Sequence, residues 1–400
     1  MYVAKLDVSW FRSPFLRHAF LIETPEQIDK LHRAGVRTAE IDPSRGLDVR
    51  DRSRKNDAAN QEHSISTAPD TSSAASTSLA QRTEQYAQAL QARKQLEQAV
   101  SSIFSKLAEQ GVIDYQCTTE AVSQITVVAK SLPSSTILMA LSQDRGGDRL
   151  LTQHALATCT LSLILGHTLG FGPDEVRIIA QAAMLHDIGL SQVPSEIVHG
   201  FYSGETQLSE RDRTLMESHP RLSILMLERQ RLFDERVAEI IGAHHTLLDG
   251  SGYPKTISGP FTSMQTRIVM IADRYDELLT GFGGNTPQTP HETLQSLFKE
   301  AQNGQLDYEI VSWFIKLFGI YPLHTTVWLN TGELAVVTNL NPDKQHQPVV
   351  TITHGMEGNR LQQPFSVDLA LQETHSPARS IVAVCDNTAS HLQDPFSYTT

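Results

Sequence analysis

Apolar positions recur with helical spacing along most of the chain. Between residues 81 and 110 they include Tyr86, Leu90, Leu96 and Leu107, and Gly111 follows as a stop signal. This pattern predicts a helix that packs on a neighbouring element or forms a dimer contact. Because comparable patterns continue to about residue 318, we expect a mainly α-helical fold.

The two ends of the chain depart from the helical pattern. Near the start, a short helix from Thr24 to about Ala34 and a strand up to Ile41 predict a small mixed α/β unit. Residues 51–80 lack aromatic residues and cannot bury enough surface to offset their ordering entropy. Short antiparallel strands are predicted after residue 321. The expected organisation is an N-terminal domain over residues 1–50, a disordered linker over 51–80, connecting helices over 81–130, a helical domain over 131–320, and a β-rich extension with a tail over 321–400.

Composition narrows the functional classes. The formal net charge is −12, which argues against a large electrostatic interface with a nucleic acid polymer or an anionic membrane. The three cysteines, Cys117, Cys159 and Cys385, have no paired spacing, so neither a disulfide framework nor a cysteine-based zinc site is expected. Apolar stretches fall far short of the roughly 20 residues that a spanning helix requires. We therefore expect a cytoplasmic protein without membrane insertion.

A histidine and an aspartate stand side by side at the end of an apolar helix pattern, at His186 and Asp187. Burying both groups at the inner end of such a helix costs several kcal/mol unless each is satisfied, and a metal ion satisfies both. Adjacent residues do not share a helix face, but Gly189 permits the chain to turn there. The pair therefore favours a metal site.

Further candidate ligands follow along the chain. His244 and His245 end another helix and precede a tight loop that contains Gly252, Tyr253 and Pro254. Asp273 and Asp276 lie one helical turn apart. His154, taken alone, is more often a hydrogen-bonded core residue than a ligand. Five imidazoles and two carboxylates suit one or two first-row divalent cations, with Asp187 able to bridge them. The candidate set is His154, His186, Asp187, His219, His244, His245 and Asp273.

These residues resemble the HD-GYP family of HD phosphohydrolases. The resemblance is carried by His186-Asp187-Ile-Gly, by His244-His245 with the Gly252-Tyr253-Pro254 loop, and by His219-Pro220 and Ile271 to Asp276. It implies an all-helical HD-type core over residues 131–320, with a small mixed α/β domain before it and a short β-rich segment after it.

The resemblance also implies an activity. Family members typically cleave cyclic di-GMP to pGpG, and often to GMP, by a bridging hydroxide in a binuclear site of iron or manganese. By resemblance, His154, His186, Asp187 and Asp273 hold one ion, and the remaining histidines hold the other and share Asp187. Asp187 and Asp276 are the implied catalytic residues, with Asp276 orienting water or substrate or serving only in helix packing. The family uses the GYP loop to dock GGDEF-domain proteins.

Three departures from the family pattern matter: two thin the expected contacts to substrate, and the one at Leu150 favours a binuclear site. The family's usual lysine in HDIGK is Leu190 here, and the glutamate that would hold a third metal is Leu150. The usual basic stretch after the second aspartate is Leu279 to Gly284 and beyond, without a cation. Arg274, His199 and Arg267 either compensate or are structural. The sequence favours an active but slowed phosphodiesterase, with a weak cyclic di-GMP receptor or interaction module, or an enzyme for another cyclic nucleotide, as alternatives.

Overall fold

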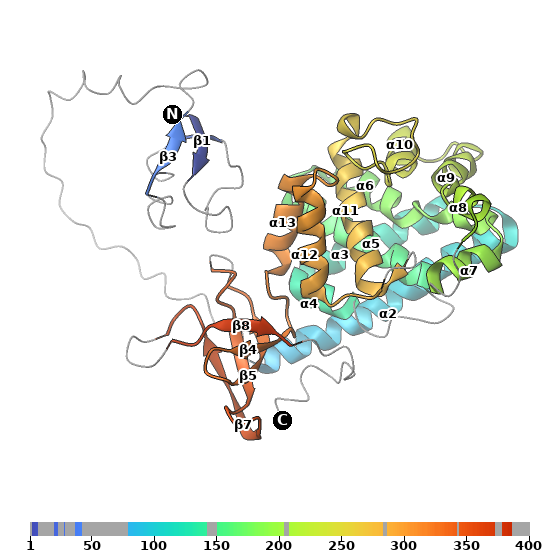
Figure 1. The fold of residues 1–400 in the computed structure, drawn as a ribbon. Coiled ribbons are helices and arrows are strands. Elements are labelled where there is room, and N and C mark those ends of the chain that lie inside the picture. Colours follow the sequence, from blue (N-terminus) through green and yellow to red (C-terminus); the bar gives the residue numbers. More distant parts are fainter. Residues whose placement is uncertain are drawn as a thin grey trace, which may run out of the picture. The chain divides into compact units, whose positions relative to one another are not determined.

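A computed structural model describes most of the chain after residue 78 and short segments before it. The chain divides into two compact units, residues 1–82 and 83–400 (Figure 1). The described residues are 2–6, 20–22, 28, 37–41, 79–141, 150–203, 208–282, 286–341, 344–372 and 378–385.

The described part of the first unit is a small antiparallel sheet. Its strands are β1 (Tyr2–Leu6), β2 (Phe20–Leu21) and β3 (Ala39–Ile41), in the order β2-β1-β3. The strand predicted to end at Ile41 is therefore β3. The predicted helix from Thr24 to Ala34 and the predicted linker fall almost entirely outside the described residues.

The second unit is mainly helical, and side chains cap many of its helices. Asp234 accepts a hydrogen bond from the backbone of Arg236, and Ser263 accepts one from the backbone of Thr266. Such caps satisfy amides that have no partner inside a helix. The helices are α2 (Leu79–Gln110), α3 (Tyr115–Ser131), α4 (Ser134–Leu141), α5 (Leu150–Thr168), α6 (Pro173–Leu185), η4 (Ile188–Gln192), α7 (Ser195–Ser203), α8 (Glu210–Met216), α9 (His219–Glu228), α10 (Glu235–Ala243), η5 (Gly259–Phe261), α11 (Met264–Thr280), α12 (Pro290–Gln302) and α13 (Tyr308–Phe318).

Helix α5 is the central element of the helical core. Every residue from Thr152 to Gly166 is buried, and α5 packs against α6 and α11. The absence of a polar face on this helix is therefore explained by neighbours on all sides. His154 lies on this buried helix, one turn from its start.

Helix α2 buries its apolar positions within the chain itself. Val100, Ile103 and Leu107 are almost fully buried, and Tyr86 packs with Ala140 of α4. Of the two roles predicted for this helix, packing on a neighbouring element is the one that the structure confirms. A dimer contact is not needed to cover these residues.

The C-terminal part of the second unit is an antiparallel sheet of order β7-β6-β5-β4-β8. Its inner face buries Val327, Ala335, Val337 and Ile352. The strands predicted after residue 321 are present, and β7 and β8 extend the sheet beyond them. The fold class is therefore confirmed. The strands are β4 (Thr326–Leu329), β5 (Leu334–Asn339), β6 (Val349–His354), β7 (Arg360–Asp368) and β8 (Ile381–Val384).

Across the segments that the structure describes, the helices are too short or too polar to span a bilayer.

Candidate metal centre

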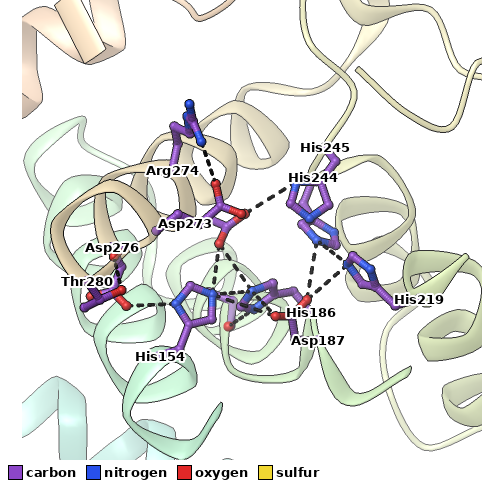
Figure 2. Close-up of polar contacts among 12 residues, drawn as sticks. His154, His186, Asp187, His219, His244, His245, Asp273, Arg274, Asp276 and Thr280 are labelled. Atoms are coloured by element: carbon purple, nitrogen blue, oxygen red, sulfur yellow. Dashed lines mark hydrogen bonds and ion pairs between the residues drawn. The ribbon is translucent and has the colours of Figure 1, made fainter. Parts of the chain in front are cut away.

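Five helices deliver the candidate ligands to one buried place (Figure 2). The residues come from α5, the end of α6, the start of α9, the end of α10 and the middle of α11. The structure brings all seven together, and all but the half-buried His245 are fully buried. They are His154, His186, Asp187, His219, His244, His245 and Asp273.

The His186-Asp187 pair can converge because α6 ends at Leu185, just before the pair, and η4 begins at Ile188, just after it. Asp187 has φ −100° and ψ 7°, outside α-helical geometry. The turn is tied to α9, because Gly189 donates its amide to Ser223 Oγ at 2.8 Å and Ser223 Oγ donates to the His186 carbonyl at 2.8 Å. A Cβ on Gly189 would collide with the His219 carbonyl oxygen. Glycine is therefore required for α9 to approach the turn.

Three of the histidines are oriented in the same way. The Nδ1 atoms of His186, His219 and His244 donate to the carbonyls three residues earlier, at 2.7, 2.7 and 2.6 Å. We infer the tautomer from this geometry, because a carbonyl can only accept. The Nε2 atom of each ring then carries a lone pair directed into the centre, which is the form that binds a metal ion.

His154 is oriented by a carboxylate instead. Its Nδ1 lies 2.8 Å from Asp276 Oδ2, while its Nε2 lies 3.0 Å from Asp273 Oδ1 and 3.1 Å from His186 Nε2. The ring of Phe282 stacks on it at a centroid distance of 4.3 Å. Asp276 thus contacts the ring nitrogen that faces away from the other ligands.

The two oxygens of Asp187 face two different pairs of histidines. Oδ1 lies 3.1 Å from His219 Nε2 and 3.8 Å from His244 Nε2. Oδ2 lies 3.5 Å from His186 Nε2 and 3.8 Å from His154 Nε2. This arrangement suits a carboxylate that bridges two cations.

The centre has polar atoms that only a cation or a proton satisfies. Asp187 Oδ1 is buried without a hydrogen-bond partner, although His219 Nε2 is close, because that nitrogen presents a lone pair. His219 Nε2 and His244 Nε2 lie 3.2 Å apart, so two lone pairs face each other. Orphaned buried acceptors of this kind are costly, and a divalent ion would satisfy them. The residues therefore fit a divalent metal.

Family models match three parts of the chain. Residues 139–310 match the HD domain, residues 1–117 a domain of unknown function (DUF3391), and residues 326–387 a KOW domain associated with the HD domain. The chain is 26% identical over 338 residues to the cyclic di-GMP phosphodiesterase PA4108 of Pseudomonas aeruginosa, covering 84% of this chain and 78% of that protein. It is 34% identical over 144 residues to the cyclic di-GMP phosphodiesterase response regulator RpfG of Xanthomonas campestris, covering 36% of each.

Residues 139–310 are an HD domain, and the similarity to cyclic di-GMP phosphodiesterases supports an HD-GYP protein.

Two other comparisons are more distant. A 3′3′-cGAMP-specific phosphodiesterase 2 of Vibrio cholerae is 31% identical over 142 residues, covering 35% of this chain and 26% of that protein. Among solved structures, Bd1817, an HDG"Y"P protein from Bdellovibrio bacteriovorus, matches with a TM-score of 0.46 and 20% identity, covering 56% of this chain and 69% of that one.

Burial and neighbouring charges shift the pKa values of the candidate ligands. Burial lowers the pKa of His245 to about 3, although Asp273 opposes this, and burial lowers the pKa of His244 well below its usual range. For His154 burial acts in the same direction, but the hydrogen bonds to Asp273 and Asp276 outweigh it and raise the pKa well above its usual value. The two carboxylates thus favour the protonated form of His154, whereas burial favours the neutral forms of His244 and His245.

The GYP loop packs against the candidate ligand His245 through Tyr253. The Tyr253 amide donates to the His245 carbonyl at 3.0 Å, and the two rings lie 4.6 Å apart. A Cβ on Gly252 would collide with the same carbonyl. The loop therefore fixes the position of His245 from behind, a role that the sequence did not indicate.

Two further residues at the centre were missed by sequence reasoning, Glu277 and Phe282. Glu277 lies four residues after Asp273, so helical spacing could have placed both carboxylates on one face. Burial, together with the charge of Asp273, raises the pKa of Glu277 to about 8, while Arg274 opposes the shift. Phe282 follows the C-cap Gly281, and no sequence signal points to its contact with His154.

The three cationic candidates differ in their surroundings. Arg274 binds Glu300 at 2.8 Å and Glu277 at 3.0 Å, and Arg267 binds Asp307 at 2.8 Å. Both arginines are therefore engaged in ion pairs, whereas His199 is exposed on α7. The leucine at the usual lysine position, Leu190, is only 2% exposed and packs in an apolar cluster with Val193 and Met216.

Proposed function

We propose that this chain is a metal-dependent phosphodiesterase that hydrolyses cyclic di-GMP to pGpG and further to GMP. The observation that carries the proposal is the position of Asp187, whose two oxygens face separate pairs of histidines. PA4108, which this chain matches over most of its length, is a cyclic di-GMP phosphodiesterase by name, and so is RpfG.

The distances support two overlapping ligand sets. One comprises His154, His186 and Asp273 with Asp187 Oδ2, and the other comprises His219, His244 and His245 with Asp187 Oδ1. Nitrogen and carboxylate donors suit iron or manganese, which we propose as the resident metals.

When bound, two such ions would lower the pKa of a water molecule and take up negative charge on the phosphorus centre. The other residues at the centre position the proposed ligands and supply no positive charge of their own. Backbone carbonyls fix the rings of three histidines, Asp276 fixes His154, and Phe282 covers the His154 ring. Asp276 therefore acts through His154 in this proposal, instead of contacting water or substrate.

Substrate recognition is the weaker part of the site. Leu190 offers no cation, and Arg274 and Arg267 are already paired, so the metal ions would supply most of the positive charge that an anionic dinucleotide needs. We accordingly expect a slow enzyme. A receptor or interaction module that docks GGDEF-domain proteins through the GYP loop is the alternative, and 3′3′-cGAMP is an alternative substrate because relatives specific for it are similar to this chain.

Turnover by the full chain tests the proposal. Protein loaded with manganese, or with ferrous iron under low oxygen, is incubated with cyclic di-GMP and with 3′3′-cGAMP, and products are separated by chromatography. We expect pGpG from cyclic di-GMP, and no product from the His186→Ala/Asp187→Ala double variant. Binding without turnover at full metal content would favour the receptor, and faster hydrolysis of 3′3′-cGAMP would reassign the substrate.

A further inference from the structure

Glu277 places a further carboxylate at the edge of the metal centre. It lies one turn after Asp273 on α11, and its side chain is 16% exposed. One ligand atom each from His245, Asp273 and Glu277 lie within 4.8 Å of one another. This spacing is compatible with three donors around one cation.

Asp273 is placed to serve both sides of the centre. Its Oδ1 atom lies 3.0 Å from His154 Nε2 and 3.5 Å from His186 Nε2, whereas its Oδ2 atom lies 3.8 Å from His245 Nδ1 (Figure 2). The second oxygen is therefore directed away from the first group of ligands. Glu277 follows on the same helix, and one of its oxygens lies within 4.8 Å of a ligand atom of Asp273.

His245 is oriented differently from the other histidines of its group. His219 and His244 donate Nδ1 to a backbone carbonyl, but the His245 Nδ1 contact seen among the described residues is the one to Asp273. Tyr253 instead packs on its ring. The Nδ1 edge of His245 is consequently available to a ligand on the Asp273 side.

Glu277 is held as metal-binding carboxylates usually are. Arg274 Nη1 donates to Glu277 Oε2 at 3.0 Å, and Glu300 fixes the same guanidinium through Nε at 3.1 Å and Nη2 at 2.8 Å. Ligating carboxylates are commonly hydrogen-bonded by a second layer of residues that sets their direction. One oxygen of Glu277 is thus fixed by Arg274, which leaves the other for a ligand.

We propose that Glu277 is an additional ligand of the metal centre and binds a divalent cation together with His245 and Asp273. This inference rests on the metal centre proposed above. The extra carboxylate holds the ion on the His245 side more tightly. Retention of that ion matters in this chain, because positive charge at the site comes from the metals and Leu190 supplies none.

Metal binding by the full chain tests the inference. Metal-free protein is titrated with Mn²⁺, the free ion is followed by electron paramagnetic resonance, and each affinity is obtained by chelator competition. We expect Glu277→Gln to weaken the more loosely held ion by at least about tenfold, the order of effect seen when metal-site support is removed. Glutamine keeps the length of the side chain and an acceptor for Arg274.

Glu300→Gln is the matched control. This change removes the other carboxylate that pairs with the Arg274 guanidinium. Because Glu300 is not one of the three donors, we expect the affinities for both ions to stay near those of the wild type. Equal affinities in Glu277→Gln and Glu300→Gln would overturn the role of Glu277 alone. A wild-type chain that binds no divalent cation would overturn the metal centre itself, and binding without turnover would overturn only the proposed enzyme.

Discussion

The Nδ1 atom of His154 lies 2.8 Å from Oδ2 of Asp276, and both side chains are buried. A carboxylate behind a ligating imidazole fixes the ring and raises its basicity. The sequence suggested that Asp276 orients water or substrate, or serves in helix packing. Its contact with His154 makes it a positioning residue for a proposed metal ligand.

Replacing Asp276 should therefore act on metal binding. We expect Asp276→Ala to weaken the ion held by His154 by about 10- to 100-fold, because the imidazole loses its fixed orientation. Asp276→Asn retains an acceptor for His154 Nδ1 and should weaken the binding of that ion less. Chelator competition measures both affinities. If Asp276→Ala binds metal normally but loses turnover, Asp276 contacts water or substrate after all.

Removing a ligand that two ions share should release more metal than removing a ligand that binds one ion. Asp187 faces both pairs of histidines, whereas His219 lies close to one oxygen only. We expect Asp187→Ala to lose both ions and His219→Ala to lose one, as measured by elemental analysis after gel filtration. Retention of one full equivalent by Asp187→Ala would argue against the bridging role.

Restoring the family's lysine at position 190 should destabilise the protein. Leu190 is 2% exposed among Val193, Met216 and other apolar side chains, so a lysine there would bury an unpaired charge. We expect Leu190→Lys to lower the free energy of unfolding by about 3–5 kcal/mol, with no gain in rate. Leu190→Met conserves volume and should cost less than about 1.5 kcal/mol. Urea denaturation measures both, and a faster, stable Leu190→Lys enzyme would contradict this.

Parts of the site were readable from the sequence because their polarity conflicts with their surroundings. His186 and Asp187 end an apolar helix, and two charged or polar groups rarely stand there without a partner. The sequence signal for His154 as a ligand was weaker, because a single histidine on an apolar helix is also a common core residue. Its partner Asp276 lies 122 residues further along the chain, and the contact between them depends on the packing of α5 against α11.

Other features left no readable pattern. Strand β7 carries mostly exposed or half-buried side chains, so no alternation of apolar and polar residues marks it. From the sequence, a leucine at position 190 indicated that a cation is missing. It did not indicate that the side chain of Leu190 packs in an apolar cluster. Phe282 stacks on His154 only because Gly281, at φ 75°, ends α11 and turns the chain.

The metal-free protein should lose stability as the pH rises above the usual histidine range. Burial lowers the pKa of His154, but Asp273 and Asp276 raise it well above 6.5. A raised pKa stabilises the folded state below the unfolded-state pKa, and that stabilisation is lost as the pH rises through the folded-state pKa. Metal uptake must displace this proton, so the metal affinity should increase with pH.

Thermal melts of metal-free and metal-loaded protein at several pH values measure this. We expect the difference between the two melting temperatures to widen above about pH 6.5, the ordinary pKa of a histidine. Asp276→Ala removes one cause of the shift and should flatten the trend. A difference that stays constant with pH would contradict a protonated His154.

The GYP loop supplies the last prediction, at Gly252. Its missing Cβ leaves room for the His245 carbonyl and the Leu247 amide, so Gly252→Ala must displace the backbone that carries a proposed ligand. We expect a loss of about 1–3 kcal/mol in unfolding free energy, together with weaker metal binding. Gly250 is the control: it has φ 81° and open space around it, and asparagine tolerates that conformation, so Gly250→Asn should bind metal normally. Equal metal affinities in the two variants would show that the loop does not position His245.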